Sequence, residues 1–272
     1  MRLLILPALL QLMTAGPVAA QAAPSAHQPD AEAIRTAIAA GRLEEASTLL
    51  LIRDAQHPGA QDDALMLARG ELALARGSAT DAERLIEGVA AEGALRCGVK
   101  RIRALALMER AHDDSAIDRL GAVAEGCAPD WRVWRALGTL LGEKSERDAS
   151  RFAFAQALAA GGDPSMLRND RARALIGMGD LTGAAETLQD GVTSAPQDAA
   201  SRQLLDLVNG MRGFEPERAA SDTDERWAQR LADAADGARR AGRTALARSL
   251  IDQALLASPR YDERLLAAAK RP

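Results

Sequence analysis

The stretch GDLTGAAETL, residues 179–188, recurs along the chain with small variations. Three further segments share its pattern of Gly, an Ala five residues later and an aliphatic residue four further on: GRLEEASTLL (41–50), GSATDAERLI (77–86) and GRTALARSLI (242–251). The prolines keep this register, because Gly41 to Gly179 and Pro58 to Pro196 are both 138 residues apart. Three residue types in one register indicate a repeated structural unit rather than a chance effect of composition.

The composition favours helices almost throughout the chain. Of 272 residues, about 60 are Ala, whereas aromatic residues make up only 3%. Ala, Leu, Arg and Glu are good helix formers, and the β-branched and aromatic residues that favour strands are few. We therefore expect an all-α protein. The composition argues against all-β folds and against parallel-sheet nucleotide-binding folds.

Small residues recur between these segments at steps of 36, 34, 34 and 34 residues: Ala46, Ala82, Ala116, Ser150 and Ala184. In this spacing the chain resembles the tetratricopeptide repeat (TPR) family. The unit with the closest match has the family's order of an aromatic residue, Leu-Gly, a large residue and then small-x-x-x-Phe-x-x-small: Trp134, Leu137, Gly138, Leu141, Ser150, Phe154 and Ala157. The resemblance implies a right-handed superhelical solenoid of antiparallel helix hairpins.

The small residues have a physical role in such hairpins. Two helices approach closely only where the residues at their crossing are Gly, Ala or Ser. On the first helices of repeats two to five, these residues are expected to be Gly70, Ala104, Gly138 and Ala172. The Gly that opens each recurring segment can adopt the left-handed conformation that ends the first helix.

We expect about seven repeats over residues 30–260, of which the sixth is degenerate. In the sixth unit Asp206 and Arg218 fall where small residues belong, and Pro216 interrupts the expected second helix. An irregular joint is therefore predicted between Gly213 and Thr223. A capping helix and tail are expected over residues 261–272, where the helix would cover the last apolar face of the stack.

Residues 1–20 have the features of a secretory signal peptide. Arg2 precedes an apolar run over residues 3–13, and the small residues up to Ala20 suit cleavage before Gln21. The run is shorter than the roughly 20 apolar residues that cross a bilayer. We expect export to the periplasm, a flexible leader over residues 21–29 and no transmembrane segment in the mature chain. The alternative is an uncleaved amphipathic helix or interfacial anchor.

The expected location bears on the state of the two cysteines, Cys97 and Cys127. An oxidising compartment favours a disulfide between them, and the alternative is two free thiols in the core. No CxxC motif is present, which argues against thiol redox chemistry as a function.

The sequence contains no recognisable catalytic or metal-binding motif. His27, His57 and His112 have no partner at metal-ligand spacing, and no nucleophile elbow or Gly-rich phosphate loop occurs. Paired acidic residues such as Asp62-Asp63 and Asp113-Asp114 fall at expected helix starts, where they suit capping. We therefore predict a non-enzyme without cofactor or metal. A net charge of −4 and few aromatic residues also argue against nucleic-acid binding.

The TPR register implies which side chains lie on the concave face. Among those in the central repeats, the polar side chains that we expect to contact a partner are Arg101, Arg132, Arg135, Asn169, Arg173 and Gln203. Four arginines would form a basic stripe that suits acidic segments of a protein or peptide partner. The alternative is that they only solvate a helix face. The family's carboxylate clamp of Lys and Asn is not reproduced.

The segment from Asn169 to Met211 is similar to the exported TPR accessory proteins of Tad-type (Flp) pilus assembly. This resemblance implies a non-catalytic periplasmic scaffold that serves assembly of an envelope structure. The lipid-attachment Cys that members of that group often carry is absent from the expected cleavage site. Two alternatives stay open: an accessory or regulatory subunit of a cell-envelope enzyme, and a cytoplasmic TPR protein with an uncleaved N-terminus.

The intact mass of the protein purified from an exporting host tests the signal peptide. We expect a chain that begins at Gln21, because signal peptidase cleaves after small residues such as Ala20. A mass that includes residues 1–20 would contradict cleavage and favour the uncleaved alternatives.

Overall fold

The computed structural model describes residues 30–59, 62–258 and 263–269, and within these it contains fourteen α-helices, one short 3-10 helix and no strand. Five hairpins follow one another: α1 (Ala31–Ala39) and α2 (Leu43–Gln56), α3 (Asp63–Ala75) and α4 (Ala79–Leu85), α5 (Arg96–Arg110) and α6 (Asp114–Gly126), α7 (Trp131–Glu143) and α8 (Arg147–Ala159), α9 (Pro164–Gly177) and α10 (Leu181–Ser194). The remaining helices are α11 (Ala199–Arg212), α12 (Asp224–Arg240), α13 (Thr244–Ala257) and α14 (Glu263–Ala269). The predicted signal peptide and leader, residues 1–29, lie outside the described residues.

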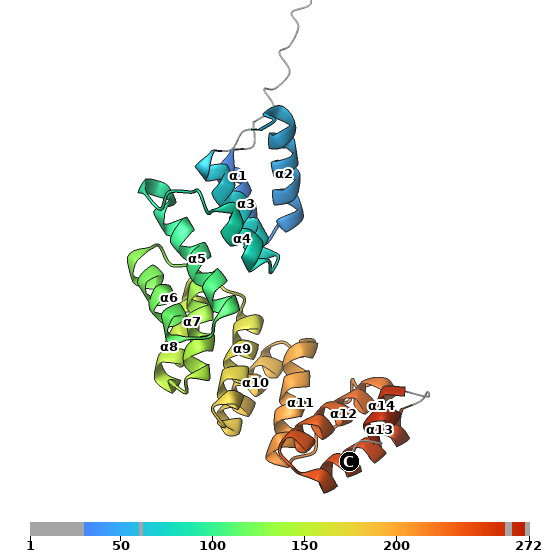
Figure 1. Ribbon diagram of the computed structural model, residues 1–272. Coiled ribbons are helices and arrows are strands. Elements are labelled where there is room, and N and C mark those ends of the chain that lie inside the picture. The colour runs from blue at the N-terminus through green and yellow to red at the C-terminus, as the bar shows by residue number, and fades with distance from the viewer. Residues whose placement is uncertain (1–29, 60–61, 259–262, 270–272) are drawn as a thin grey trace, which may run out of the picture.

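The first helices of the hairpins form the inner layer of an elongated stack (Figure 1). Helices α1, α3, α5, α7, α9 and α11 each pack against the next first helix. Each second helix packs against the first helix of its own hairpin and of the next one. The layer with continuous helix contacts lies on the concave side of a curved stack. The expected all-α solenoid of antiparallel hairpins is therefore confirmed.

The helix crossings depend on the small residues that recur in the sequence. On the second helices, Ala46, Ala82, Ala116, Ser150 and Ala184 are each at most 2% exposed. The glycines opposite them on the first helices have no free space for a side chain. A Cβ on Gly70 would lie 2.8 Å from Cγ2 of Ile86, and one on Gly138 would lie 3.0 Å from the ring of Phe154. A side chain at either position would force these neighbouring side chains to shift.

The turns within the hairpins have two backbone conformations. The Gly at positions 41, 77, 179 and 242 has φ between 71° and 79°, which is the left-handed region. Ser145 takes the same conformation, with φ of 63°, in the hairpin of α7 and α8. Ala111 does not, because the third hairpin turns through extended backbone and Asp113 then caps α6 by accepting the N–H of Ala116 at 3.0 Å.

The sixth unit has no second helix. Helix α11 ends at Gly213, whose φ is 91°, and α12 begins after Thr223, which accepts the N–H of Arg226 at 3.2 Å. Residues 214–222 between them form turns and irregular backbone. The joint therefore lies where the sequence indicates it, because Pro216 and the polar residues around it do not support a helix.

Helix α12 packs directly on α11 in place of the missing helix. A Cβ on Gly210 would lie 1.8 Å from the carbonyl oxygen of Ala234, and one on Gly237 would lie 1.9 Å from that of Leu207. These two glycines let the helix backbones come into van der Waals contact. The repeat register does not point to them, because they serve a helix pair that occurs once in the stack.

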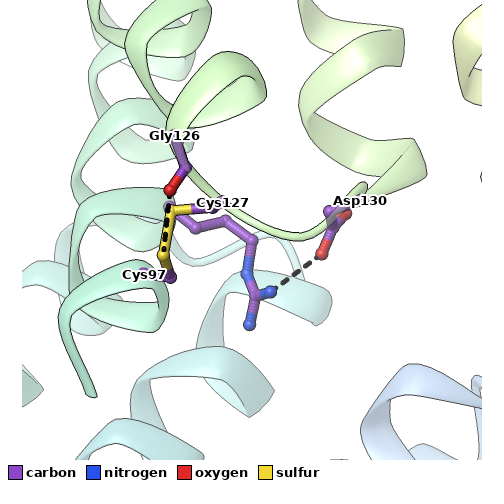
Figure 2. The surroundings of a disulfide bond; sticks show 5 residues. Cys97, Gly126, Cys127 and Asp130 are labelled. Atoms are coloured by element: carbon purple, nitrogen blue, oxygen red, sulfur yellow. Dashed lines mark hydrogen bonds and ion pairs between the residues drawn. A yellow bond between two sulfur atoms is a disulfide. The ribbon is translucent and has the colours of Figure 1, made fainter. Parts of the chain in front are cut away.

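A disulfide joins Cys97 and Cys127, with Cα atoms 5.7 Å apart (Figure 2). Cys97 lies in the first turn of α5 and Cys127 follows α6, so the bond closes the open end of the third hairpin. The two cysteines are 30 residues apart in the chain. A loop of this size stabilises the fold by about 3–4 kcal/mol in the chain-entropy model.

The last hairpin, α12 and α13, is covered by α14. Leu265 of α14 is 5% exposed and packs into the same apolar cluster as Leu250 and Ile251. The predicted cap thus corresponds to α14, and the remainder of residues 261–272 lies outside the described residues.

Gly210→Ala tests the contact between α11 and α12. We expect a loss of about 1–3 kcal/mol or more, because the new methyl group would overlap the Ala234 carbonyl. Hydrogen exchange should show faster opening of α11 and α12. Gly121→Ala in α6 is the control. A Cβ there meets nothing within 4 Å, so it should stabilise by about 0.5–1 kcal/mol through helix propensity. Unchanged protection of α11 in Gly210→Ala would contradict the packing.

Candidate functional site on the concave face

Charged side chains form a ladder along the first helices. We call the arginine ladder the following residues of α1, α3, α5, α7 and α9, with the residue that caps α7: Arg35, Glu71, Arg101, Asp130, Arg132, Arg135, Asp170 and Arg173. The ladder includes four of the six residues expected on the concave face, and three carboxylates that the sequence register did not place there.

The first half of the ladder is built around Glu71 of α3, which is 8% exposed. Its carboxylate pairs with Arg35 of α1 at 3.3 Å and with Arg101 of α5. Arg101 also pairs with Asp130 at 3.0 Å, and this carboxylate lies close to the disulfide (Figure 2). Because Arg101 is only 22% exposed and has two acidic partners, it mainly joins neighbouring hairpins.

Arg132 makes a contact across the solenoid. Its guanidinium donates to the carbonyl oxygen of Ile38, at the end of α1, over 3.2 Å. It also lies 3.9 Å from Asp130 and 5.0 Å from the centre of the Trp131 ring. Helix C-termini attract cations, so this arginine is placed to bridge the first and fourth hairpins.

The second half of the ladder is more accessible. Arg135 of α7 donates to Asp170 of α9 at 2.6 Å, and Arg173 pairs with the same carboxylate at 3.0 Å. Asp170 is 12% exposed, whereas Arg135 is 42% and Arg173 60% exposed. One carboxylate shared by two guanidinium groups leaves a net positive charge, and each guanidinium has unused N–H donors. These two arginines can therefore bind a further anion.

Two of the expected site residues have other roles. Asn169 is 5% exposed, and its Oδ1 accepts a hydrogen bond from the hydroxyl of Ser201 at 2.8 Å. The prediction that Asn169 is available to a partner is therefore wrong, since its side chain joins α9 to α11 inside the stack. Gln203 is exposed and donates to Asp233 of α12 at 3.3 Å.

The ladder differs from the uncompensated basic stripe that we predicted. A signal for its carboxylates exists in the sequence, since three of the ion pairs join residues about one repeat apart. The separations are 36 residues for Arg35 and Glu71, 30 for Glu71 and Arg101, and 35 for Arg135 and Asp170. A search for opposite charges one repeat apart on first helices would have found them.

A buried ion-pair network holds the irregular joint after α11. Arg230 of α12 donates to both oxygens of Asp206, at 2.8 and 2.9 Å, and to Asp222 at 2.7 Å. It also donates to the carbonyl oxygen of Glu217 in the joint at 2.8 Å. Hydrogen bonds from Arg230 to Asp206 raise the pKa of the guanidinium, which stays a cation. Asp206, which falls where the repeat register expects a small residue, thus holds the arginine that fixes the joint.

Asp233 lies at the C-terminal end of the same face and is 9% exposed. It accepts from Gln229 at 3.0 Å and from Gln203 at 3.3 Å, but no cation pairs with it among the described residues. Burial raises the pKa of the Asp233 carboxyl, and the two amide donors offset this only in part.

The described residues include no group of three His, Cys, Asp or Glu side chains placed to hold a metal ion. The acidic pairs act as caps, since Asp62 accepts the N–H of Leu65 at 2.7 Å as Asp113 does at α6. Of the helices described, none is both long and apolar enough to cross a bilayer.

Asp233→Asn tests the raised pKa. The folded protein binds a proton at Asp233 more readily than the unfolded chain, so stability falls as the pH rises from 3.8 through the folded pKa. The variant keeps the shape without the charge. Its denaturation midpoint relative to wild type should therefore be higher at pH 7 than at pH 4. If the difference in denaturation midpoint between Asp233→Asn and wild type were the same at pH 4 and pH 7, the raised pKa of Asp233 would be contradicted.

No family model and no curated protein matches this chain. Among solved structures, it is similar to a tetratricopeptide repeat protein from Parabacteroides merdae, with 13% identity, 88% of this chain and 95% of that chain covered, and a TM-score of 0.47. It is also similar to the C-terminal part of a TPR repeat-containing protein from Cytophaga hutchinsonii, with 11% identity, 89% of this chain and 100% of that chain covered, and a TM-score of 0.49. A third similar structure is YrrB, a TPR protein with an unusual peptide-binding site, with 16% identity, 71% of this chain and 97% of that chain covered, and a TM-score of 0.38. With small residues at the crossings of its own successive hairpins, this chain has a TPR-like fold.

Proposed function

We propose that this protein is a non-catalytic scaffold that binds a protein or peptide partner on its concave face. The observation that carries the proposal is the Arg135–Asp170–Arg173 cluster, in which two exposed guanidinium groups share one carboxylate. The first helices hold this cluster on a rigid inner wall, which lowers the entropic cost of binding. A TPR-like solenoid with such a face is a protein-interaction scaffold.

The partner's chemistry follows from the same cluster. Guanidinium groups bind carboxylates with two parallel hydrogen bonds, so an acidic segment of an extended peptide suits Arg135 and Arg173. Arg101 and Arg132 contribute less, because each already bridges neighbouring or distant hairpins.

We place the scaffold in the periplasm, in assembly of an envelope structure such as a Tad-type (Flp) pilus. The N-terminal sequence and the resemblance of residues 169–211 support this role, and the Cys97–Cys127 disulfide supports an oxidising compartment. The disulfide argues against the alternative of a cytoplasmic protein. An accessory or regulatory subunit of a cell-envelope enzyme stays the second candidate, since its binding face would be the same.

Crosslinked envelope extract tests the proposed face. Arg135→Glu combined with Arg173→Glu should lose a partner that wild type retains, because three acidic groups would then stand in one place and repel an acidic segment. Affinity capture followed by mass spectrometry measures the loss. A captured pilus-assembly component would support the proposed process, whereas a wall-modifying enzyme would favour the second candidate.

Arg84→Glu is the matched control for this experiment. Arg84 lies on the second helix α4, is 71% exposed and pairs with Asp81 at 2.7 Å. The substitution changes the net charge by the same amount per residue as each concave-face substitution, but on a second helix, away from the concave face. The same partner list for wild type and for the concave-face variant, or an equal loss with Arg84→Glu, would contradict the proposed face.

A further inference from the structure

A groove lies on the outer side of the stack between the second helices α8 and α10, with the first helix α9 as its floor. Its volume is about 610 Å³, within the range of sites that bind peptide side chains or small molecules. Leu158, Leu175 and Met178 supply apolar surface, and Leu158 is 51% exposed. The groove therefore has an exposed apolar side chain at its edge and apolar side chains beneath it.

Two arginines of α9 line the groove. Arg168 and Arg171 lie three residues apart on α9, and both are half-buried. Within the ranges that the structure describes, no carboxylate lies within ion-pairing distance of either guanidinium. At the rim of the same groove, by contrast, Arg147 pairs with Asp180 and Arg151 with Asp148. Partly buried cations ordinarily have an anionic partner, because desolvation is costly without one.

We propose that this outer groove binds a segment of a partner protein that carries apolar side chains and a carboxylate. The carboxylate would lie between Arg168 and Arg171, which satisfies both cations with charge-assisted hydrogen bonds. The apolar side chains would cover Leu158, Leu175 and Met178. An amphipathic helix laid between α8 and α10 meets these conditions, since its apolar face fits a groove between helices.

The opposite rim restricts the orientation of this segment. Glu186 and Asp190 of α10 also line the groove and are exposed. They repel further acidic residues, so the carboxylate has to face α9 and a neutral or basic flank has to face α10. The groove therefore selects an acidic residue at one place rather than negative charge in general.

The chain offers a matched comparison two repeats earlier. Arg103 precedes Ala104 on α5 as Arg171 precedes Ala172 on α9, and it is likewise half-buried without an ionic partner among the described residues. The hollow beside it, about 440 Å³, is lined by polar and charged side chains that include Glu83 and Glu87. With no apolar floor, it lacks the second requirement of the proposed site.

The test uses a fluorescent synthetic helical peptide with Leu along one face and a single Glu at its border, and a matched peptide with Gln in place of Glu. Fluorescence anisotropy measures binding to the full protein. We expect saturable binding of the Glu peptide, weaker binding of the Gln peptide, and a loss of about tenfold or more in Arg168→Glu combined with Arg171→Glu. Leu158→Asp should also weaken binding. Because Leu158 is exposed, the variant should keep its fold, which circular dichroism checks.

Arg103→Glu should leave binding unchanged. So should the concave-face variant with Arg135→Glu and Arg173→Glu, which keeps failure of this site separate from failure of the proposed function. Three results would overturn the proposal: no saturable binding at millimolar peptide, equal binding of the Gln peptide, or an equal loss in Arg103→Glu. Self-association that Leu158→Asp abolishes would assign the groove to a second copy of the chain and would also overturn it.

Discussion

The close approach of paired helices is the constraint on which the rest of this structure depends. Ala46, Ala82, Ala116 and Ala184 are fully buried at the crossings, and Gly70 and Gly138 face side chains with no space for a Cβ. Hairpins this compact cannot bury their apolar faces alone, so each must stack on the next. The elongated shape, the inner wall of first helices and the outer grooves all follow from that stacking.

The sixth unit shows how the stack continues where the repeat fails. One helix is missing, and α12 fills the space by packing on α11 through Gly210 and Gly237. The chain between them is held by Arg230, which pairs with Asp206 and Asp222 in a buried setting. Loss of one partner would leave an uncompensated buried charge, which typically costs about 3–5 kcal/mol. The joint is thus specified by polar contacts rather than by apolar periodicity.

The concave face combines stability with recognition. Glu71, Asp130 and Asp170 tie successive first helices together through arginines, and most of these pairs are partly buried. Only where Arg135 and Arg173 share Asp170 does the ladder leave accessible positive charge. The outer groove offers the complementary case, since Arg168 and Arg171 have no partner within the described chain. A scaffold with two such faces could hold two segments at once, which raises affinity through effective concentration.

The sequence by itself determined the helical class, the hairpin register and the place of the irregular joint, because small residues at a fixed spacing report helix crossings directly. It also singled out Cys97 and Cys127 as a pair that an oxidising compartment would join. The tertiary structure alone decided which charges meet. Asn169 was expected at the surface and is buried, while Glu71, Asp170 and Arg230 were not singled out and are central. Ion pairs between hairpins join side chains about 30 to 36 residues apart in the chain. The spacing of opposite charges marks candidate pairs, but the stacking of the hairpins decides which of these side chains come within reach of one another.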